Sequence, residues 1–396
     1  MKIAIYTNKI SPHLLPLARE LARVVGEKEI VYVYTERMSN ERLKLGWEGE
    51  SKEKWVRCFS ESPEELWDNL ETCELLLCGE RDIGLMETRE HAGRTTLYIS
   101  ERWLKPMSIG FERSTIDPSW GIRLPGIVRI FSPRYFLMAR KFVKLLKGSR
   151  HLIFLPAGIW AARDMARLVG LLGGFSGWRF RRAPELDFEG RPGGKIWVCG
   201  KENDKELLRE YCLDKMRMWG YFVEPSKFRT TREKAIEAVP SKYLWVGRLV
   251  WWKRLDAVVK AFANNPERCL DIYGDGPELN RLKRLVGKLG ANVRMHSPVP
   301  IAEVRKVMRE HDVYILASNM CEGWGAVLNE ALEEGMSVIG TFEAGSSATI
   351  LPEKNLFHSG DVDGLSALIQ KGVARYTEDK WSVGNAALAV LEHWVQ

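Results

Sequence analysis

The sequence has few cysteines and no hydrophobic run long enough to cross a membrane. Its seven cysteines are an odd number, and the closest pair, Cys73 and Cys78, lacks the spacing of metal ligands. We therefore expect reduced cysteines that serve as small apolar side chains. No apolar run reaches the roughly 18 residues that a spanning helix requires, and no hydrophobic leader precedes the first expected strand. These absences predict a cytoplasmic protein.

Two further signatures are missing. The turn after the first expected strand, residues 2–7, reads Asn-Lys-Ile-Ser-Pro-His in place of Gly-x-Gly-x-x-Gly, so we expect no dinucleotide site there. Solenoid repeats and low-complexity tracts are also absent from the sequence. The 396 residues, 45% of them hydrophobic, are enough for two ordinary domains with full cores.

Acidic residues are absent between Arg123 and Arg150, where eight basic residues accompany an apolar series. The sequence leaves three interpretations of this segment open: a basic amphipathic helix on an anionic membrane surface, a groove for a polyanionic glycan or lipid-linked phosphate, and a half-buried helix with a solvated cationic face. The formal net charge of the chain is +7. Because no nucleic-acid-binding motif accompanies this charge, we expect no nucleic-acid partner.

Residues 313–334 have the pattern of a buried strand, a glycine-rich loop and a helix that ends at Gly335. Glu322 lies in the loop and Glu330 about one turn into the helix. The free N–H groups at the start of such a helix suit a phosphate, and flanking carboxylates accept hydrogen bonds from hydroxyls. A nucleotide-sugar, with diols on both sides of a diphosphate, has this layout. The alternative is a surface helix with solvated acids.

Two upstream segments repeat the pattern of strand, glycine turn and helix. In residues 243–262 the turn follows Gly247 and places Arg248 and Lys253 close together, where a guanidinium and an ammonium can hold a diphosphate. Residues 269–279 contain a strand followed by Gly-Asp-Gly-Pro. Three such units within about a hundred residues indicate a parallel sheet with ligands at its carboxyl edge.

The order of these motifs resembles the donor half of the retaining GT-B glycosyltransferases of glycosyltransferase family 4. Gly-Arg-Leu with a following Lys, Gly-Asp-Gly-Pro, and Glu-Gly-x-Gly with a second Glu occur in the family's order over residues 241–361. The resemblance implies an α/β fold of two Rossmann-like domains that face each other across a cleft. It also implies a retaining, metal-independent transfer of a sugar from a uridine or guanosine diphosphate sugar, without a cofactor.

The same resemblance implies the site residues. Arg248 and Lys253 would bind the donor diphosphate next to Gly247. Glu322 would contact the transferred sugar, and together with the two cations it is an expected catalytic residue. Glu330 would contact the ribose, and the backbone near Val299 would hold the base. The loop would supply N–H groups to the phosphate and the sugar, from Gly323, Trp324, Gly325, Ala326 and Val327.

The beginning of the chain departs from the family pattern. The glycine-rich loop after the first strand is absent, and the central strand that ends in a histidine in many relatives here ends in Ser-Glu-Arg over residues 100–102. His13 and Glu101 are therefore the acceptor-side candidates. The Trp-Gly-Tyr-Phe segment over residues 219–222 resembles one in transferases that build bacterial surface polysaccharides. This favours a glycan or lipid-linked acceptor and a role in polysaccharide biosynthesis, at the inner membrane face if residues 123–150 bind the membrane.

Four parts of the chain are expected. They are an N-terminal acceptor-binding domain, a linker, a C-terminal donor-binding domain, and a helix that crosses back to the first domain, over residues 1–224, 225–240, 241–377 and 378–396. Within the first domain we expect a long loop over residues 178–194 and a last strand over residues 215–223. In the C-terminal helix, one face is expected to carry Trp381, Leu388, Leu391 and Trp394.

Asp361-Val362-Asp363 has the form of an Asp-x-Asp metal motif, but its place before a short helix predicts a helix N-cap, and we expect no metal site. The sequence leaves the base, the sugar, the acceptor, the linkage and the oligomeric state open. Two alternatives to a transferase also stay open. One is a sugar-nucleotide epimerase or hydrolase of the same architecture, and the other is a non-catalytic subunit that binds a glycan or a membrane.

Overall fold

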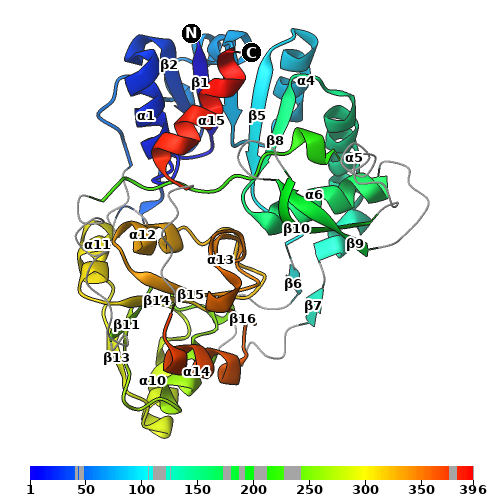
Figure 1. Ribbon diagram of the computed structural model, residues 1–396. Coiled ribbons are helices and arrows are strands. Elements are labelled where there is room, and N and C mark those ends of the chain that lie inside the picture. Colours follow the sequence, from blue (N-terminus) through cyan, green and yellow to red (C-terminus); the bar gives the residue numbers. More distant parts are fainter. Residues whose placement is uncertain are drawn as a thin grey trace.

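Two six-stranded parallel sheets form the two halves of the molecule, one above the other in Figure 1. The computed structural model describes residues 1–40, 43, 49–105, 107–109, 122–124, 126–172, 180–186, 192–199, 212–226, 242–373 and 381–395. Most of the expected linker, residues 227–240, lies outside these ranges. Within them, no helix is both long and apolar enough to pass through a membrane.

The first sheet has the strand order β3-β2-β1-β4-β5-β8, with every neighbouring pair parallel. Its central strands are short apolar runs that helices cover on both faces, which is the usual environment of parallel strands. The strands span Ile3–Thr7, Ile30–Tyr34, Val56–Cys58, Leu75–Cys78, Thr95–Ser100 and Leu152–Pro156 in chain order. The helices α1, α3, α4, α5 and α6 span Leu15–Val25, Pro63–Thr72, Ile83–His91, Pro133–Gly148 and Ile159–Leu172.

The second sheet repeats this order as β13-β12-β11-β14-β15-β16, again with parallel neighbours. Its strands β11 to β16 span Lys242–Val246, Cys269–Tyr273, Val293–His296, Val313–Leu316, Ser337–Thr341 and Leu356–Phe357. The helices α9 to α14 span Leu255–Ala263, Leu279–Leu289, Ile301–Arg309, Val327–Glu333, Gly345–Ile350 and Val362–Lys371. The predicted fold class, α/β with two Rossmann-like halves, is confirmed.

In each sheet the chain first adds strands on one side of its first strand and then crosses over to add strands on the other side. This switch point lies between β1 and β4 in the first sheet and between β11 and β14 in the second. Loops that leave the carboxyl ends of two such strands turn to opposite sides, which leaves room for a ligand between them. Each half therefore offers one natural binding position, and the residues that follow β1, β4, β11 and β14 decide what binds there.

Several sequence-based expectations about single elements are decided by the structure. Asp361 is the N-cap of α14, because its side chain accepts a hydrogen bond of 2.9 Å from the N–H of Gly364, so that prediction is confirmed. The loop expected over residues 178–194 is wrong, since β9 (Phe180–Leu186) pairs antiparallel with β10 (Pro192–Cys199). Prolines and glycines in this segment suggested a loop, whereas residues 6 to 19 positions apart in the sequence, from Leu186 with Pro192 to Phe180 with Cys199, pair as a hairpin.

The strand expected over residues 215–223 is also wrong. A 3₁₀ turn, Leu213–Lys215, is followed by extended chain that pairs with the first sheet only at two isolated bridges, from Met216 to Phe154 and from Trp219 to Ala157. The apolar alternation is real, but it buries the segment against β8 without forming a continuous ladder.

The last helix, α15 (Val383–Val395), packs against α1 in the first half, as Figure 1 shows in red. Its expected apolar face is wrong at Leu388, which is 62% exposed. Smaller residues form the buried face instead: Val383, Ala386, Ala387 and Val390. Trp381 is buried just before the helix, and the side chain of Trp394 lies outside the described part.

Candidate functional site

The switch point between β11 and β14 brings Lys253 and Glu322 into an ion pair, although they are 69 residues apart in the sequence. The ammonium of Lys253 donates to Oε2 of Glu322, and the two side chains are only 17% and 14% exposed. Ser318 Oγ donates to the same oxygen over 2.8 Å. Within the described residues, Oε1 of Glu322 accepts no hydrogen bond. The pair therefore keeps one carboxylate oxygen and further ammonium N–H groups available to a ligand.

The backbone around this pair is fixed by short-range hydrogen bonds. Lys253 ends a 3₁₀ turn, Trp251–Lys253, and Arg254 then takes a left-handed conformation with φ of 53° that starts α9. The N–H of Asn319 donates to the carbonyl of Trp252 over 2.8 Å, which joins the loop after β14 to the turn after β11. This hydrogen bond ties the loop that carries the carboxylate to the turn that carries the cation.

Glycine is required where β11 ends. Gly247 has a φ of 152°, and a Cβ on the neighbouring Gly274 would lie 2.0 Å from the carbonyl oxygen of Gly247. The turns after β11 and β12 therefore pass in backbone contact. Arg248 follows directly and is exposed, and among the described residues it forms no ion pair or hydrogen bond. The structure does not join Arg248 to Lys253 or Glu322; it leaves the guanidinium at the rim of the same sheet edge.

Glu330 lies in the first turn of α12 and is half-buried. Burial raises the pKa of its carboxyl to about 7, and the positive charge of Arg305 only partly opposes this effect. No described residue donates a hydrogen bond to this carboxylate. A buried acid without a partner costs free energy, and groups of this kind are frequent at binding sites. Val299 lies beyond β13, partly buried against the core.

The loop between the two glutamates lies against the first half of the chain. A Cβ on Gly323 would lie 2.5 Å from Oε2 of Glu101, so only a glycine allows this approach. Gly325 has a φ of 86°, and Ala326 is the N-cap residue before Val327, the first residue of α12. Trp324 is 1% exposed. Its backbone can still face a ligand, but its side chain points into the protein.

Glu101 and His13, the two acceptor-side candidates, are joined through Tyr221. The Tyr221 hydroxyl donates to Oε1 of Glu101 over 2.7 Å, and its ring stacks on His13 at 5.6 Å between centroids. Lys105 Nζ donates to Oε2 of Glu101 over 2.5 Å. Burial would raise the pKa of Glu101, but the charge and hydrogen bond of Lys105 lower it overall. Burial lowers the pKa of His13 to about 4, against the opposing charge of Glu101, so its imidazole is neutral at pH 7.

Tyr221 and Lys105 are site residues that the sequence analysis missed. Tyr221 belongs to the Trp-Gly-Tyr-Phe segment that was noted for its resemblance, but nothing in the sequence pairs it with Glu101, 120 residues away. Lys105 lies four residues after Glu101, and this spacing was the one available signal.

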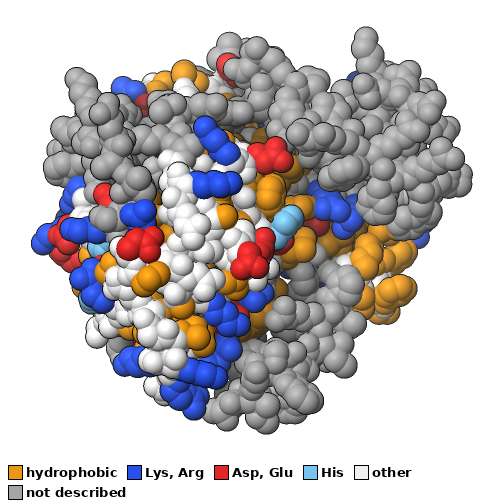
Figure 2. All heavy atoms as spheres, turned by 60° about the horizontal axis from the view of Figure 1, so that its bottom comes forward, with side chains coloured by type: hydrophobic (Ala, Val, Ile, Leu, Met, Phe, Trp, Pro, Cys, Tyr) orange, Lys and Arg blue, Asp and Glu red, His pale blue; other side chains and the backbone are white. Residues whose placement is uncertain are grey.

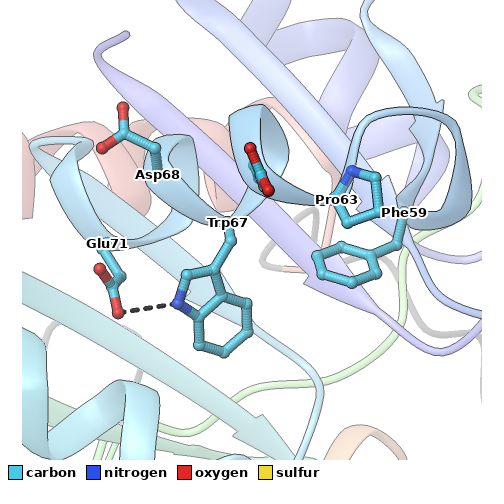
Figure 3. A pocket seen from close by; sticks show the side chains of 6 residues that line it. Phe59, Pro63, Trp67, Asp68 and Glu71 are labelled. Atoms are coloured by element: carbon cyan, nitrogen blue, oxygen red, sulfur yellow. Dashed lines mark hydrogen bonds between the residues drawn. The ribbon is translucent and has the colours of Figure 1, made fainter.

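A hollow lies on α3, in the first half (Figure 3). Phe59, Pro63 and Trp67 form its apolar floor, and the remaining lining side chains are the carboxylates of Glu64, Asp68 and Glu71. The indole N–H of Trp67 donates to Glu71 over 2.8 Å. Since carboxylates repel phosphate, this hollow does not suit a nucleotide. Within the described residues, no cluster of side chains could hold a metal ion either.

Comparison with known proteins gives a family match in the second half of the chain. Residues 227–381 match the family model of glycosyl transferases group 1. The GtfA subunit of the UDP-N-acetylglucosamine–peptide N-acetylglucosaminyltransferase of Streptococcus gordonii is 28% identical over 224 residues, 52% of this chain and 41% of the relative. The phosphatidyl-myo-inositol mannosyltransferase of Mycobacterium tuberculosis is 30% identical over 144 residues, 34% of this chain and 37% of the relative. The chain thus aligns with less than half the length of these curated relatives.

Two solved structures share the architecture of the whole chain. Anabaena Alr3699/HepE in complex with UDP has a TM-score of 0.56 at 14% identity, with 100% of this chain and 96% of that chain covered. The lipopolysaccharide outer core galactosyltransferase WaaB also has a TM-score of 0.56, at 12% identity, with 99% of each chain covered. The fold is thus that of GT-B glycosyltransferases, and the match to the glycosyl transferases group 1 family lies in residues 227–381.

Proposed function

We propose that this protein is a retaining, metal-independent glycosyltransferase that moves a sugar from a UDP-sugar to a glycan or lipid-linked acceptor. The observation that carries the proposal is the Lys253–Glu322 ion pair at the switch point of the second sheet, with donor and acceptor groups to spare. We propose uridine as the base, and this is supported by the HepE structures with UDP and with UDP-glucose and by the S. gordonii relative, which is named for a UDP-sugar.

The donor lies along the carboxyl edge of the second sheet in this proposal. Lys253 and Arg248 bind the diphosphate, with the backbone of the loop after Glu322 contributing N–H groups. Oε1 of Glu322 accepts a hydrogen bond from a hydroxyl of the transferred sugar. Glu330 accepts from the ribose, and the chain near Val299 meets the base.

The chemistry then consists mainly of stabilising the departing diphosphate. The bond between the anomeric carbon and the phosphate oxygen breaks, and its electron pair stays on the UDP, where the two cations stabilise the charge. The acceptor oxygen attacks the anomeric carbon from the same face, and its proton passes to the leaving phosphate oxygen. Glu101, ionised and placed against Gly323, orients an acceptor or sugar hydroxyl from the opposite half.

A donor screen tests the proposed function. The protein is incubated with UDP- and GDP-sugars, with and without glycan and lipid-linked acceptors, in the presence of EDTA. We expect acceptor-dependent release of UDP and a product that keeps the anomeric configuration of the donor. Acceptor-independent conversion to an epimer or to free sugar as the main activity would support the epimerase or hydrolase. A folded protein that binds no nucleoside diphosphate would support a non-catalytic subunit.

Glu330 gives a pH-dependent prediction. Its pKa of about 7 in the folded protein lies above the ordinary 4.5, so the folded state binds the proton more tightly than the unfolded chain. Stability from this group is therefore present at low pH and is lost as the pH rises from 4.5 towards 7. We expect Glu330→Gln to raise the melting temperature at about pH 8 and to leave it unchanged at about pH 4, below both pKa values. Thermal unfolding at both pH values measures this effect.

Donor binding should depend on the same proton. Ribose hydroxyls donate to the ionised carboxylate, so UDP-glucose should bind more tightly to the wild-type protein as the pH rises through about 7. Glu330→Gln should bind it more weakly at high pH and without this dependence. Calorimetric titrations from about pH 6 to about pH 8 measure this dependence. The same pH dependence of UDP-glucose affinity in both proteins would contradict the ribose contact of Glu330.

The basic segment is proposed to hold the protein on an anionic membrane surface at the inner face of the membrane. Helix α5 is half-buried through Ala139, Phe142, Val143 and Leu146. Lys and Arg side chains also gather on the face shown in Figure 2, so basic charge alone does not distinguish the α5 region as a membrane-binding surface. Exposed apolar side chains distinguish it, because Phe131 is 82% and Leu137 62% exposed, close in sequence to the basic residues. Basic charge with exposed apolar side chains is the pattern of an interfacial helix.

Vesicle binding tests this part of the proposal. We expect the protein to sediment with vesicles that contain phosphatidylglycerol and to stay in solution with pure phosphatidylcholine. Phe131→Ser combined with Leu137→Ser should reduce the bound fraction severalfold. Leu388→Ser, on α15 and as exposed as Leu137, is the matched control and should bind like the wild-type protein. Equal binding to both vesicle types would contradict a role for the basic charge.

A further inference from the structure

Arg102 joins the two halves of the molecule at the loop that carries Glu322. Its guanidinium forms a bidentate ion pair with Asp164 of α6, with distances of 3.0 and 3.2 Å, and the two side chains are 5% and 0% exposed. The remaining terminal nitrogen, Nη1, donates to the carbonyl of Met320 over 3.0 Å. Met320 lies two residues before Glu322 in the donor loop, defined here as residues 318–326.

The orientation of Arg102 is set by the first half alone. Asp164 also accepts a hydrogen bond of 3.0 Å from the N–H of Leu104, so the carboxylate, the segment after β5 and the guanidinium form one rigid unit. A planar guanidinium held by two parallel hydrogen bonds has a fixed direction for its remaining N–H groups. That direction points at the donor loop, where Nη1 meets the carbonyl of Met320.

The same loop is held by the first half from a second side. Trp324 is buried against Gly220, where an added Cβ would lie 2.4 Å from its ring, and against Gly158, where it would lie 3.1 Å away. Its indole N–H donates to Asn329 in α12 over 2.7 Å. The position of Met320 and the position of Trp324 thus both depend on the first half, and Glu322 lies between them.

We infer that Arg102 is a positioning residue for donor binding: by holding the Met320 carbonyl, it fixes the loop that presents Glu322 to the sugar and N–H groups to the diphosphate. The inference rests on the proposed function for the identity of the ligand. The acceptor-side half thereby contributes to donor affinity although Arg102 itself touches only protein. Lysine, whose three N–H groups all belong to one nitrogen, cannot reach both Asp164 oxygens and the Met320 carbonyl in this geometry.

A matched control exists in the same half. Arg89 is a fully buried arginine, and within the described residues its guanidinium donates only to groups of the first half, among them the hydroxyl of Thr96 and the carbonyls of Leu70, Glu71, Cys73 and Thr95. Arg89→Lys removes comparable buried hydrogen bonds without touching the donor loop. It therefore separates a loss of general stability from a loss of loop position.

The test compares Arg102→Lys, Asp164→Asn and Arg89→Lys with the wild-type protein, well below their melting temperatures. Hydrogen exchange of the ligand-free proteins should show faster exchange in residues 318–326 for Arg102→Lys, and a smaller effect for Asp164→Asn, with no change in that loop for Arg89→Lys. Calorimetry should show UDP bound about tenfold more weakly by Arg102→Lys, since one hydrogen bond to a charged group is lost. The isosteric Asp164→Asn keeps the test available if Arg102→Lys does not fold.

The outcomes separate the inference from the proposed function. Unchanged exchange in the donor loop of both variants overturns the positioning role, and so does unchanged UDP affinity when the wild-type protein binds UDP. Equal weakening by Arg89→Lys also overturns it, because the effect would then be general destabilisation. If the wild-type protein binds neither UDP nor GDP, the proposed function fails, and loop-confined exchange in Arg102→Lys still supports the positioning of the loop.

Discussion

Glu322→Ala is expected to lower the kcat of sugar transfer by about 100-fold or more while changing donor affinity much less. Oε1 of Glu322 accepts no hydrogen bond within the described residues, whereas Oε2 is held by Lys253 and Ser318. The carboxylate is therefore fixed in place with one oxygen directed to a ligand, and its contribution is largest when the sugar distorts towards the transition state. Single-turnover rates and donor Kd values, measured separately, distinguish the two effects.

The control for this substitution lies on α11. Glu303 pairs with Lys306, and both side chains are more than half exposed, so Glu303→Ala removes a carboxylate from an ion pair far more open to solvent. It should leave kcat unchanged. If Glu322→Ala were as active as Glu303→Ala, the sugar would have to bind elsewhere, and the proposed site would be wrong.

Lys253→Ala is expected to weaken donor binding by about 10- to 100-fold, because a charge-assisted hydrogen bond to phosphate is worth about 1.5–3 kcal/mol. The substitution also leaves Glu322, 14% exposed, without its counter-charge, so a moderate loss of thermal stability should accompany the loss of affinity. Calorimetric titration with UDP and with UDP-glucose measures the first effect and thermal unfolding the second.

Lys306→Ala is the corresponding control, since Lys306 is 65% exposed and its pairing distance to Glu303 is 3.8 Å. It should bind UDP as the wild-type protein does. A Lys253→Ala variant that loses stability but keeps full UDP affinity would show that Lys253 only supports Glu322 and does not meet the diphosphate.

The order of local patterns was enough to locate the donor-side candidates in the chain. Each candidate lies directly after a short apolar run, and the structure has β11 before Arg248 and Lys253, and β14 before Glu322. Apolar runs bounded by glycines predict strands because both the burial and the turn depend on neighbouring residues. The N-cap at Asp361 was also predicted correctly, because its hydrogen-bond partner Gly364 is only three residues away in the sequence.

Local patterns failed for one hairpin and for contacts between residues far apart in the sequence. The hairpin of β9 and β10 was expected to be a loop, because the segment is rich in residues typical of loops and its pairing is not visible in the sequence. Tyr221 and Arg102 received no role, although one donates to Glu101 and the other to Met320, 218 residues away. Leu388 was wrongly predicted to be buried, because α15 packs on α1 through small side chains instead. Which face of α15 is buried depends on the surface of α1, which the sequence of α15 does not contain.

The sequence by itself determined that this chain forms parallel α/β units and that two cations and two glutamates follow their strands, because strand and turn preferences act over a few residues. Only the tertiary structure decided that Lys253 reaches Glu322, that Glu330 is buried enough to raise its pKa, and that Glu101 and Arg102 lie against the donor loop. The physical reason is that these contacts depend on the strand order and on the packing of one half against the other. Both are set by the burial of apolar surface over the whole chain, which no short segment of the sequence specifies.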